Sequence, residues 1–266
     1  MPLLVLALLL VVTPPDDTAS VVAAALLRVK QADAREPTLT RFQLEHNLIL
    51  KSNGQRSGES TKLYEQTWIN GLPYKMLIER NGKPIAGEEL AQEQKRYDQF
   101  VAEHKALDEA ERARINHGKL LKSTLDFARL QTSAYRITQL RPDQCIGRPC
   151  HVYLAQPNHA APPDPNAKPF TYQLWITDTH PLLTRLTFVL PASSSESGHE
   201  TTGTLEWDLF NGNPVESHSF FIGFTTDHGH LFEIHTDNVF TRYRRFVTTS
   251  TITAVDPSQT PPDDLQ

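Results

Sequence analysis

The chain has little of what several protein classes require. Only two of its 266 residues are cysteine, too few for a multi-disulfide scaffold or a four-thiolate zinc site. It has no positive surplus, since 26 Lys and Arg face 31 Asp and Glu, and the net charge of −5 gives no electrostatic footprint for nucleic acid. Hydrophobic residues make up 39%, enough to build a core. The length suits one large β-rich domain or two small ones.

An unbroken apolar run, Leu3 to Val12, lies near the N-terminus. It is shorter than the roughly 20 residues that a bilayer-spanning helix needs, and Pro14 and Pro15 end it. We interpret residues 1–19 as a secretory signal peptide, with a buried N-terminal helix as the alternative. The mature chain is then expected in the periplasm of the bacterial envelope, or secreted, without a stable transmembrane segment.

The two cysteines, Cys145 and Cys150, lie between two strand-like runs. A hairpin loop of the four intervening residues would place the thiols opposite each other, at a separation compatible with a disulfide. Redox-active pairs normally have two intervening residues, so we favour a structural disulfide over a catalytic one. Such a bond persists in an oxidising compartment, which supports export.

Residues 20–34 are rich in Ala, Leu and Val and predict a short amphipathic helix. From Thr40 the hydrophobic period changes to two, which predicts a half-buried strand. Its apolar face carries Phe42, Leu44, His46, Leu48 and Leu50, and its wet face carries Arg41, Gln43, Glu45 and Asn47. Another such strand contains Tyr74, Met76 and Ile78.

Residues 87–130 form a predicted helical insert. Glu88 opens a long helix to residue 114 that is charged nearly all round, and residues 119–130 form a second, more apolar helix. We favour a solvated lid helix over a coiled-coil partner site for the first of them.

The remainder is predicted to be β. Candidate strands span residues 133–140, 148–156, 170–177, 183–190, 202–210, 215–225 and 230–246. Asn-Gly pairs such as Asn70-Gly71 and Asn211-Gly212 supply the turns that tight hairpins need. We therefore predict an α+β, mainly β fold: one domain over residues 20–255, built as a large curved antiparallel sheet with helices on one face, and a flexible tail over residues 256–266.

Several short segments carry a family resemblance. They are W-I-N-G-L-P-Y (68–74), L-I-E-R-N-G-K-P (77–84) before the charged helix, I-G-R-P (146–149) and W-I-T-D (175–178). In these segments the chain resembles an exported bacterial branch of the outer-membrane lipoprotein-sorting family, the LolA/LolB-like group. The resemblance implies a half-barrel, with the sheet curled around helices that cover its concave face. In the carriers of this group that face holds acyl chains. No functional residue is carried over, because the shared segments mark turns and strands.

Candidate catalytic chemistry is sparse. His228, His230, Glu233 and His235 could suggest a metal site, but strand alternation would divide them between two faces, and we favour a solvated hairpin tip. His46 is predicted to be a hydrogen-bonded residue of the core or of a cavity lining. The sequence has no Gly-x-Ser-x-Gly elbow and no phosphate-cradling loop. We therefore predict no enzyme activity, no metal and no cofactor, and keep a metal-dependent hydrolase as a third hypothesis.

The leading hypothesis is a periplasmic protein that binds an acyl chain, a lipid or a lipidated protein in the concave face of the sheet, in lipid or lipoprotein trafficking. The candidate apolar lining is Phe42, Leu44, Tyr74, Met76, Phe220, Ile222 and Phe224. The alternative is a non-catalytic structural or interaction protein of the cell envelope, with an envelope protein as its partner and a fully packed interior.

Overall fold

The computed structural model describes residues 18–33, 39–112, 114–115, 130, 134–158, 169–195 and 197–245. The tail predicted over 256–266, all of the helix predicted over 119–130 except Leu130, and all but the last two residues of the predicted signal peptide lie outside the described residues. Two helices are described in full, α1 (Thr18–Asp33) and α2 (Gly87–His104), and a short 3-10 helix spans Ala192–Ser194.

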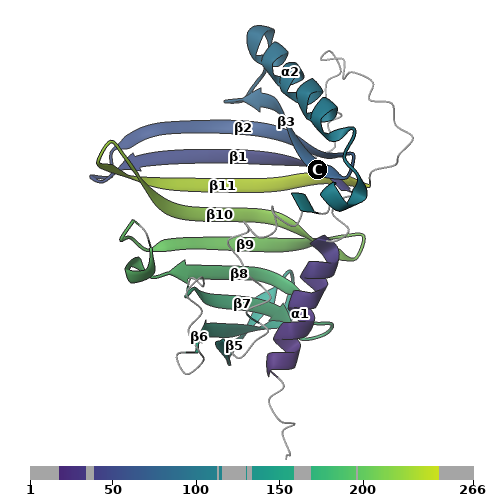
Figure 1. The fold of residues 1–266 in the computed structure, drawn as a ribbon. Helices are drawn as coiled ribbons and strands as arrows, with labels where there is room; N and C mark the ends of the chain where they lie inside the picture. Colours follow the sequence, from purple (N-terminus) through teal and green to yellow (C-terminus); the bar gives the residue numbers. More distant parts are fainter. Residues whose placement is uncertain are drawn as a thin grey trace, which may run out of the picture.

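Eleven strands form one sheet (Figure 1). They are β1 (Leu39–Lys51), β2 (Arg56–Ile69), β3 (Leu72–Arg80), β4 (Lys83–Pro84), β5 (Tyr135–Cys145), β6 (Arg148–Pro157), β7 (Thr171–Thr177), β8 (Leu183–Leu190), β9 (Thr201–Phe210), β10 (Asn213–Asp227) and β11 (His230–Arg245). Their order is β4-β3-β2-β1-β11-β10-β9-β8-β7-β6-β5, and every pair is antiparallel. The sheet is curved and unclosed, so the predicted α+β, mainly β half-barrel is confirmed.

The main core lies between α1 and the β5–β10 part of the sheet. The apolar stripe of α1 has helical spacing and is fully buried: Val22, Ala25, Leu26 and Val29. On the sheet it meets a cluster that includes Leu174, Leu186, Phe188, Leu205 and Trp207. We call this side of the sheet the α1 face.

Strand pairing assigns the remaining side chains to the two faces, because directly paired residues point the same way. One cross-strand row continues the α1 face from Leu174 through Leu186, Leu205 and Ser219 to Asn238. The neighbouring row points away from α1 and runs through Trp175, Arg185, Glu206, His218, Val239 and Leu44. We call that side the opposite face.

The predicted Asn-Gly turns are present. Asn70 and Gly71 have φ of 50° and 78°, and Asn211 and Gly212 have φ of 51° and 76°. These positive values suit the two-residue turns that match the twist of antiparallel strands. Turn chemistry therefore set these hairpins locally.

The cysteine hairpin contains the predicted disulfide but a different turn. Its turn is only Ile146-Gly147, with positive φ at both residues, and not the expected four-residue loop. The sulfurs of Cys145 and Cys150 are bonded across a Cα–Cα distance of 5.8 Å. Cys150 is paired with Asp143, so the disulfide joins diagonal and not opposite positions of the ladder.

The helical insert is interrupted within residues 88–114, where one long helix was predicted. α2 ends at His104, and residues 109–112 are helical again. The Asp108 carboxylate accepts a hydrogen bond from the Glu111 amide at 2.8 Å, and the Glu111 carboxylate accepts one from the Asp108 amide at 3.3 Å. This reciprocal capping box starts a new helix and explains the break.

Candidate functional site

All seven residues of the predicted lining lie on the opposite face. Leu44 is paired with Val239, and Phe42 is paired with Glu65, which in turn is paired with Met76. Leu44 and Val239 are 42% and 38% exposed, large values for apolar side chains in the middle of a sheet. We call Phe42, Leu44, Phe220, Ile222, Phe224 and Val239 the apolar band. The band lies on the face away from α1, and its role in ligand binding stays a prediction.

The two faces of β1 are the reverse of what the alternation suggested. Gln43, assigned to the wet face, is only 2% exposed. Its Nε2 donates to Oδ1 of Asn238 at 2.7 Å, and Nδ2 of Asn238 donates to Oγ of Ser219 at 3.3 Å. This chain of two side-chain amides and a hydroxyl occupies the α1 face across β1, β11 and β10. The apolar residues of β1 therefore lie on the opposite face, partly in contact with solvent.

Tyr74 serves a different purpose from the rest of the predicted lining. It is 4% exposed and packs against two rings of α2, with centroids 5.5 Å from Tyr97 and 4.9 Å from Phe100. Its hydroxyl donates to Oε1 of Glu93 at 2.9 Å. Burial, followed by this hydrogen bond, raises the pKa of Tyr74 above its ordinary value. Tyr74 therefore anchors α2, and we leave it out of the apolar band.

Three histidines lie among the apolar residues of the band. Nε2 of His218 lies 2.7 Å from Oδ1 of Asp237, Nε2 of His46 lies 2.7 Å from Oε1 of Glu59, and Nε2 of His235 lies 2.6 Å from a Glu233 carboxylate oxygen. The predicted hydrogen bonding of His46 is confirmed. Its predicted place in a core or cavity is wrong, because its side chain is 40% exposed.

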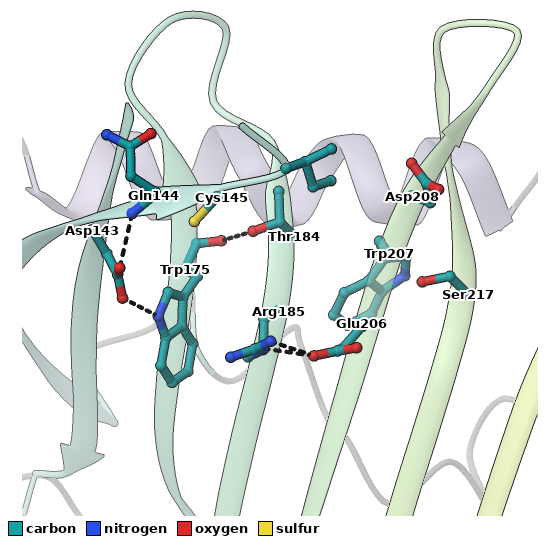
Figure 2. Close-up of a pocket in the computed structure, with 11 residues that line it drawn as sticks. Asp143, Gln144, Cys145, Trp175, Thr184, Arg185, Glu206, Trp207, Asp208 and Ser217 are labelled. Atoms are coloured by element: carbon teal, nitrogen blue, oxygen red, sulfur yellow. Dashed lines mark hydrogen bonds and ion pairs between the residues drawn. The ribbon is translucent and has the colours of Figure 1, made fainter. Parts of the chain in front are cut away.

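A hollow of about 300 Å³ is lined by Trp175, Arg185 and Glu206, among others (Figure 2). Glu206 is paired with His218. Trp175 donates its Nε1 hydrogen to Oδ2 of Asp143 at 3.1 Å, and Nε of Arg185 donates to Oε1 of Glu206 at 2.7 Å. A hydrogen bond from the backbone amide of Gln144, followed by one from the indole of Trp175, lowers the pKa of Asp143 below its ordinary value. The lining is polar, which does not suit an acyl chain. Sequence reasoning missed this site, because only strand pairing brings Trp175, Arg185 and Glu206 together.

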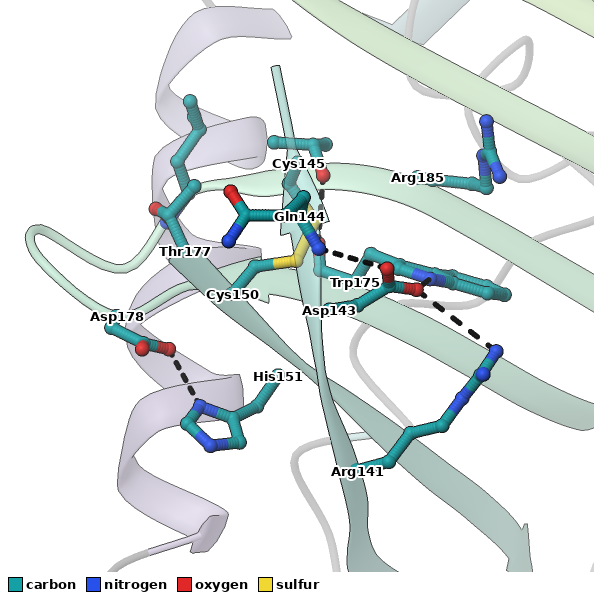
Figure 3. The surroundings of a disulfide bond; sticks show 12 residues. Arg141, Asp143, Gln144, Cys145, Cys150, His151, Trp175, Thr177, Asp178 and Arg185 are labelled. Carbon is teal, nitrogen blue, oxygen red and sulfur yellow. Dashed lines mark hydrogen bonds and ion pairs between the residues drawn. A yellow bond between two sulfur atoms is a disulfide. The ribbon is translucent and has the colours of Figure 1, made fainter. Parts of the chain in front are cut away.

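The disulfide borders the same hollow (Figure 3). Beside it, Nδ1 of His151 lies 2.6 Å from Oδ1 of Asp178. Arg141 approaches Asp143 at 4.0 Å. Both cysteines are buried, as expected of a structural bond.

The histidine hairpin does not assemble the metal site that was considered. His228 and Gly229 form its turn, and the His228 side chain is 93% exposed. Within the described part of the chain, no three His, Cys, Asp or Glu side chains are grouped in a way that could hold a metal ion. None of the described helices is both long enough and apolar enough to cross a membrane.

Comparison with known proteins gives remote structural matches. A domain from Vibrio parahaemolyticus described as an outer membrane lipoprotein-sorting protein is 12% identical, with a TM-score of 0.35, covering 84% of this chain and 93% of that one. A DUF1329 family protein from Desulfovibrio piger is 10% identical, with a TM-score of 0.34, covering 86% and 95%. The MucA/MucB complex of Pseudomonas aeruginosa is matched at 9% identity and a TM-score of 0.24, covering 87% and 99%. No family model and no curated protein matches the sequence.

Proposed function

We propose that the protein is a non-catalytic binding protein of the bacterial envelope that holds an acyl chain, a lipid or a lipidated protein on the opposite face of its sheet. The observation that carries the proposal is the apolar band, in which Leu44 and Val239 are paired and each more than one third exposed. Contiguous exposed apolar surface of this kind marks interaction sites in soluble proteins.

The energetics favour a long apolar ligand. Each methylene group taken out of water contributes about 0.8 kcal/mol, so an acyl chain lying along the band gains affinity with its length. Leu44 and Val239 are paired across β1 and β11, and Phe220 on β10 is diagonal to Val239, because its own partner on β11 is Asp237.

Uptake of a fluorescent fatty acid at pH 7.5, with native mass spectrometry of the protein purified from cells, tests the proposal. Leu44→Asn is expected to weaken uptake about tenfold, because burial of one leucine contributes about 1.5–3 kcal/mol. Leu140→Asn is the matched control, since Leu140 is 47% exposed on β5, outside the band. Absence of both bound lipid and uptake, or equal loss in the two variants, would contradict the proposal.

A second function is favoured by the packing on the α1 face. The α1 stripe and its partners on β7 and β8 are almost fully buried, as in a protein with a filled interior. A structural or interaction protein of the envelope fits this observation. It predicts no lipid in the mass spectrum and no uptake, together with retention of a protein partner.

A further inference from the structure

Histidines beside the apolar band form a group that the proposed binding role does not use. The ring of His199 stacks on that of Phe224 at 4.7 Å, and the other three lie on strands of the opposite face. They come from three adjacent strands, His218 from β10, His235 from β11 and His46 from β1. Their side chains are 24–40% exposed, so protons reach them from solvent. Imidazole is the side-chain group that ordinarily changes charge between pH 5 and 8.

The imidazoles are part of the same surface as the apolar band. His218 is paired with Val239, which is paired with Leu44. His235 is paired with Ile222, and the ring of Phe220 meets the ring of His235 edge-on at 6.0 Å. Any flat partner that covers the band therefore covers these histidines as well.

Carboxylates outnumber guanidinium groups around the histidines. Four carboxylates contact the three imidazoles: Glu59, Glu206, Glu233 and Asp237. Two guanidinium groups, those of Arg56 and Arg185, contact two of these carboxylates. At the Phe42 end of the band, Glu65 is paired with Phe42, and the guanidinium group of Arg242 lies over the Phe42 ring. The charges of Glu65 and Arg242 therefore offset each other.

The sign of the net charge on this surface depends on the protonation of the histidines. With neutral imidazoles, the four carboxylates exceed the two guanidinium groups by two negative charges. Protons on the three strand imidazoles convert that excess into one positive charge, and a proton on His199 adds another, without moving the apolar side chains. An anionic lipid surface is attracted to a basic apolar face and repelled by an acidic one.

We propose that the opposite face is a pH-gated docking surface for anionic lipid membranes, which binds them under mildly acidic conditions and releases them near neutrality. This proposal rests on the proposed lipid-binding role of the apolar band. The occupant is the charged headgroup layer of a bilayer, with the apolar band resting at its boundary with the acyl chains.

Vesicle flotation of the full chain tests the proposal. Binding to phosphatidylglycerol vesicles is expected to strengthen at least tenfold from pH 7.5 to pH 5.0, and binding to phosphatidylcholine vesicles less than twofold. The variant H46Q/H218Q/H235Q is expected to lose most of this pH dependence, because of the four imidazoles beside the band only that of His199 remains. The matched control H151Q/H228Q/H230Q, which removes three histidines outside the band, is expected to keep it.

A second variant protects the test against failure of the triple variant to fold. Asp237→Asn removes a carboxylate beside His218 and is expected to strengthen binding to phosphatidylglycerol at pH 7.5 severalfold. The proposal is overturned if binding is independent of pH, or if the triple variant keeps the full dependence. Fatty-acid uptake at pH 7.5 separates the two proposals. If the protein takes up fatty acid but binds vesicles independently of pH, only the proposed pH dependence is contradicted. If vesicle binding depends on the histidines but no fatty acid is taken up, only the proposed binding of an acyl chain is contradicted.

Discussion

The carboxylate of Glu93 on α2 accepts a hydrogen bond from the hydroxyl of Tyr74 on β3 at 2.9 Å. The same oxygen accepts from the Leu77 amide at 3.3 Å and pairs with Arg96 at 2.6 Å. Arg96 in turn donates to the carbonyl of Lys75. Leu77 and Lys75 present backbone groups at the edge of β3, so two side chains of α2 take the place that another strand would have.

Glu93→Gln is expected to lower the free energy of unfolding by about 1–3 kcal/mol, because it removes the charge from a buried carboxylate that holds several donors. Urea unfolding measures the change. Glu89→Gln is the matched control on the same helix, since Glu89 forms an exposed ion pair with Arg80. Such pairs contribute about 0–1 kcal/mol. Equal losses in the two variants would show that the buried network adds nothing.

The raised pKa of Tyr74 predicts a loss of stability in alkali. The folded state favours the neutral phenol, so this contribution is fully present below the ordinary tyrosine pKa of about 10 and is lost as the pH rises above it. Unfolding free energies between pH 8 and pH 11 should fall less steeply for Tyr74→Phe than for the parent. A slope for the parent that is no steeper than that of Tyr74→Phe would refute the assignment.

Gly203→Ala is expected to destabilise the protein by about 1–3 kcal/mol through overpacking. A Cβ atom at this position would lie 2.4 Å from the ring of Phe188 and 2.8 Å from that of Phe221. Both rings belong to the core under α1. Gly223→Ala on β10 meets nothing within 4 Å and serves as the control. Thermal unfolding that ranks the two variants equally would contradict this account of the core.

Removal of the disulfide in C145S/C150S is expected to cost about 2 kcal/mol, since the bond closes a loop with a sequence separation of only 5. Guanidinium unfolding of the parent with and without a reductant should give a similar difference. A much larger loss would mean that the bond does more than restrict the unfolded chain.

Local signals in the sequence were sufficient for most of the fold. Positive φ at Asn70 and Asn211 follows from Asn-Gly chemistry, and the strand periods placed β1, β7 and β9 close to their observed limits. β5 continues to Cys145 through Pro142, beyond the predicted end. An edge strand tolerates proline because its outward amide needs no partner. The prediction missed this because edge position depends on the whole sheet.

The candidate site was predicted less well, for a different reason. Alternation shows that Gln43 and Leu44 point to opposite sides, but not which side is covered. Asn238, 195 residues further along the chain, gives Gln43 its buried partner. Similarly, the hollow beside Trp175 exists only because β7, β8 and β9 align three distant side chains. Information of this kind lies in long-range pairing.

The seam between β1 and β11 has a consequence for how the molecule is made. β1 is the first strand in the sequence and β11 the last, yet they are neighbours in the middle of the sheet. The arm formed by β1, β2 and β3 therefore joins the rest of the sheet only after the final strand has emerged. Until then its backbone edge is open, so completion of the sheet depends on pairing between the two ends of the folded chain.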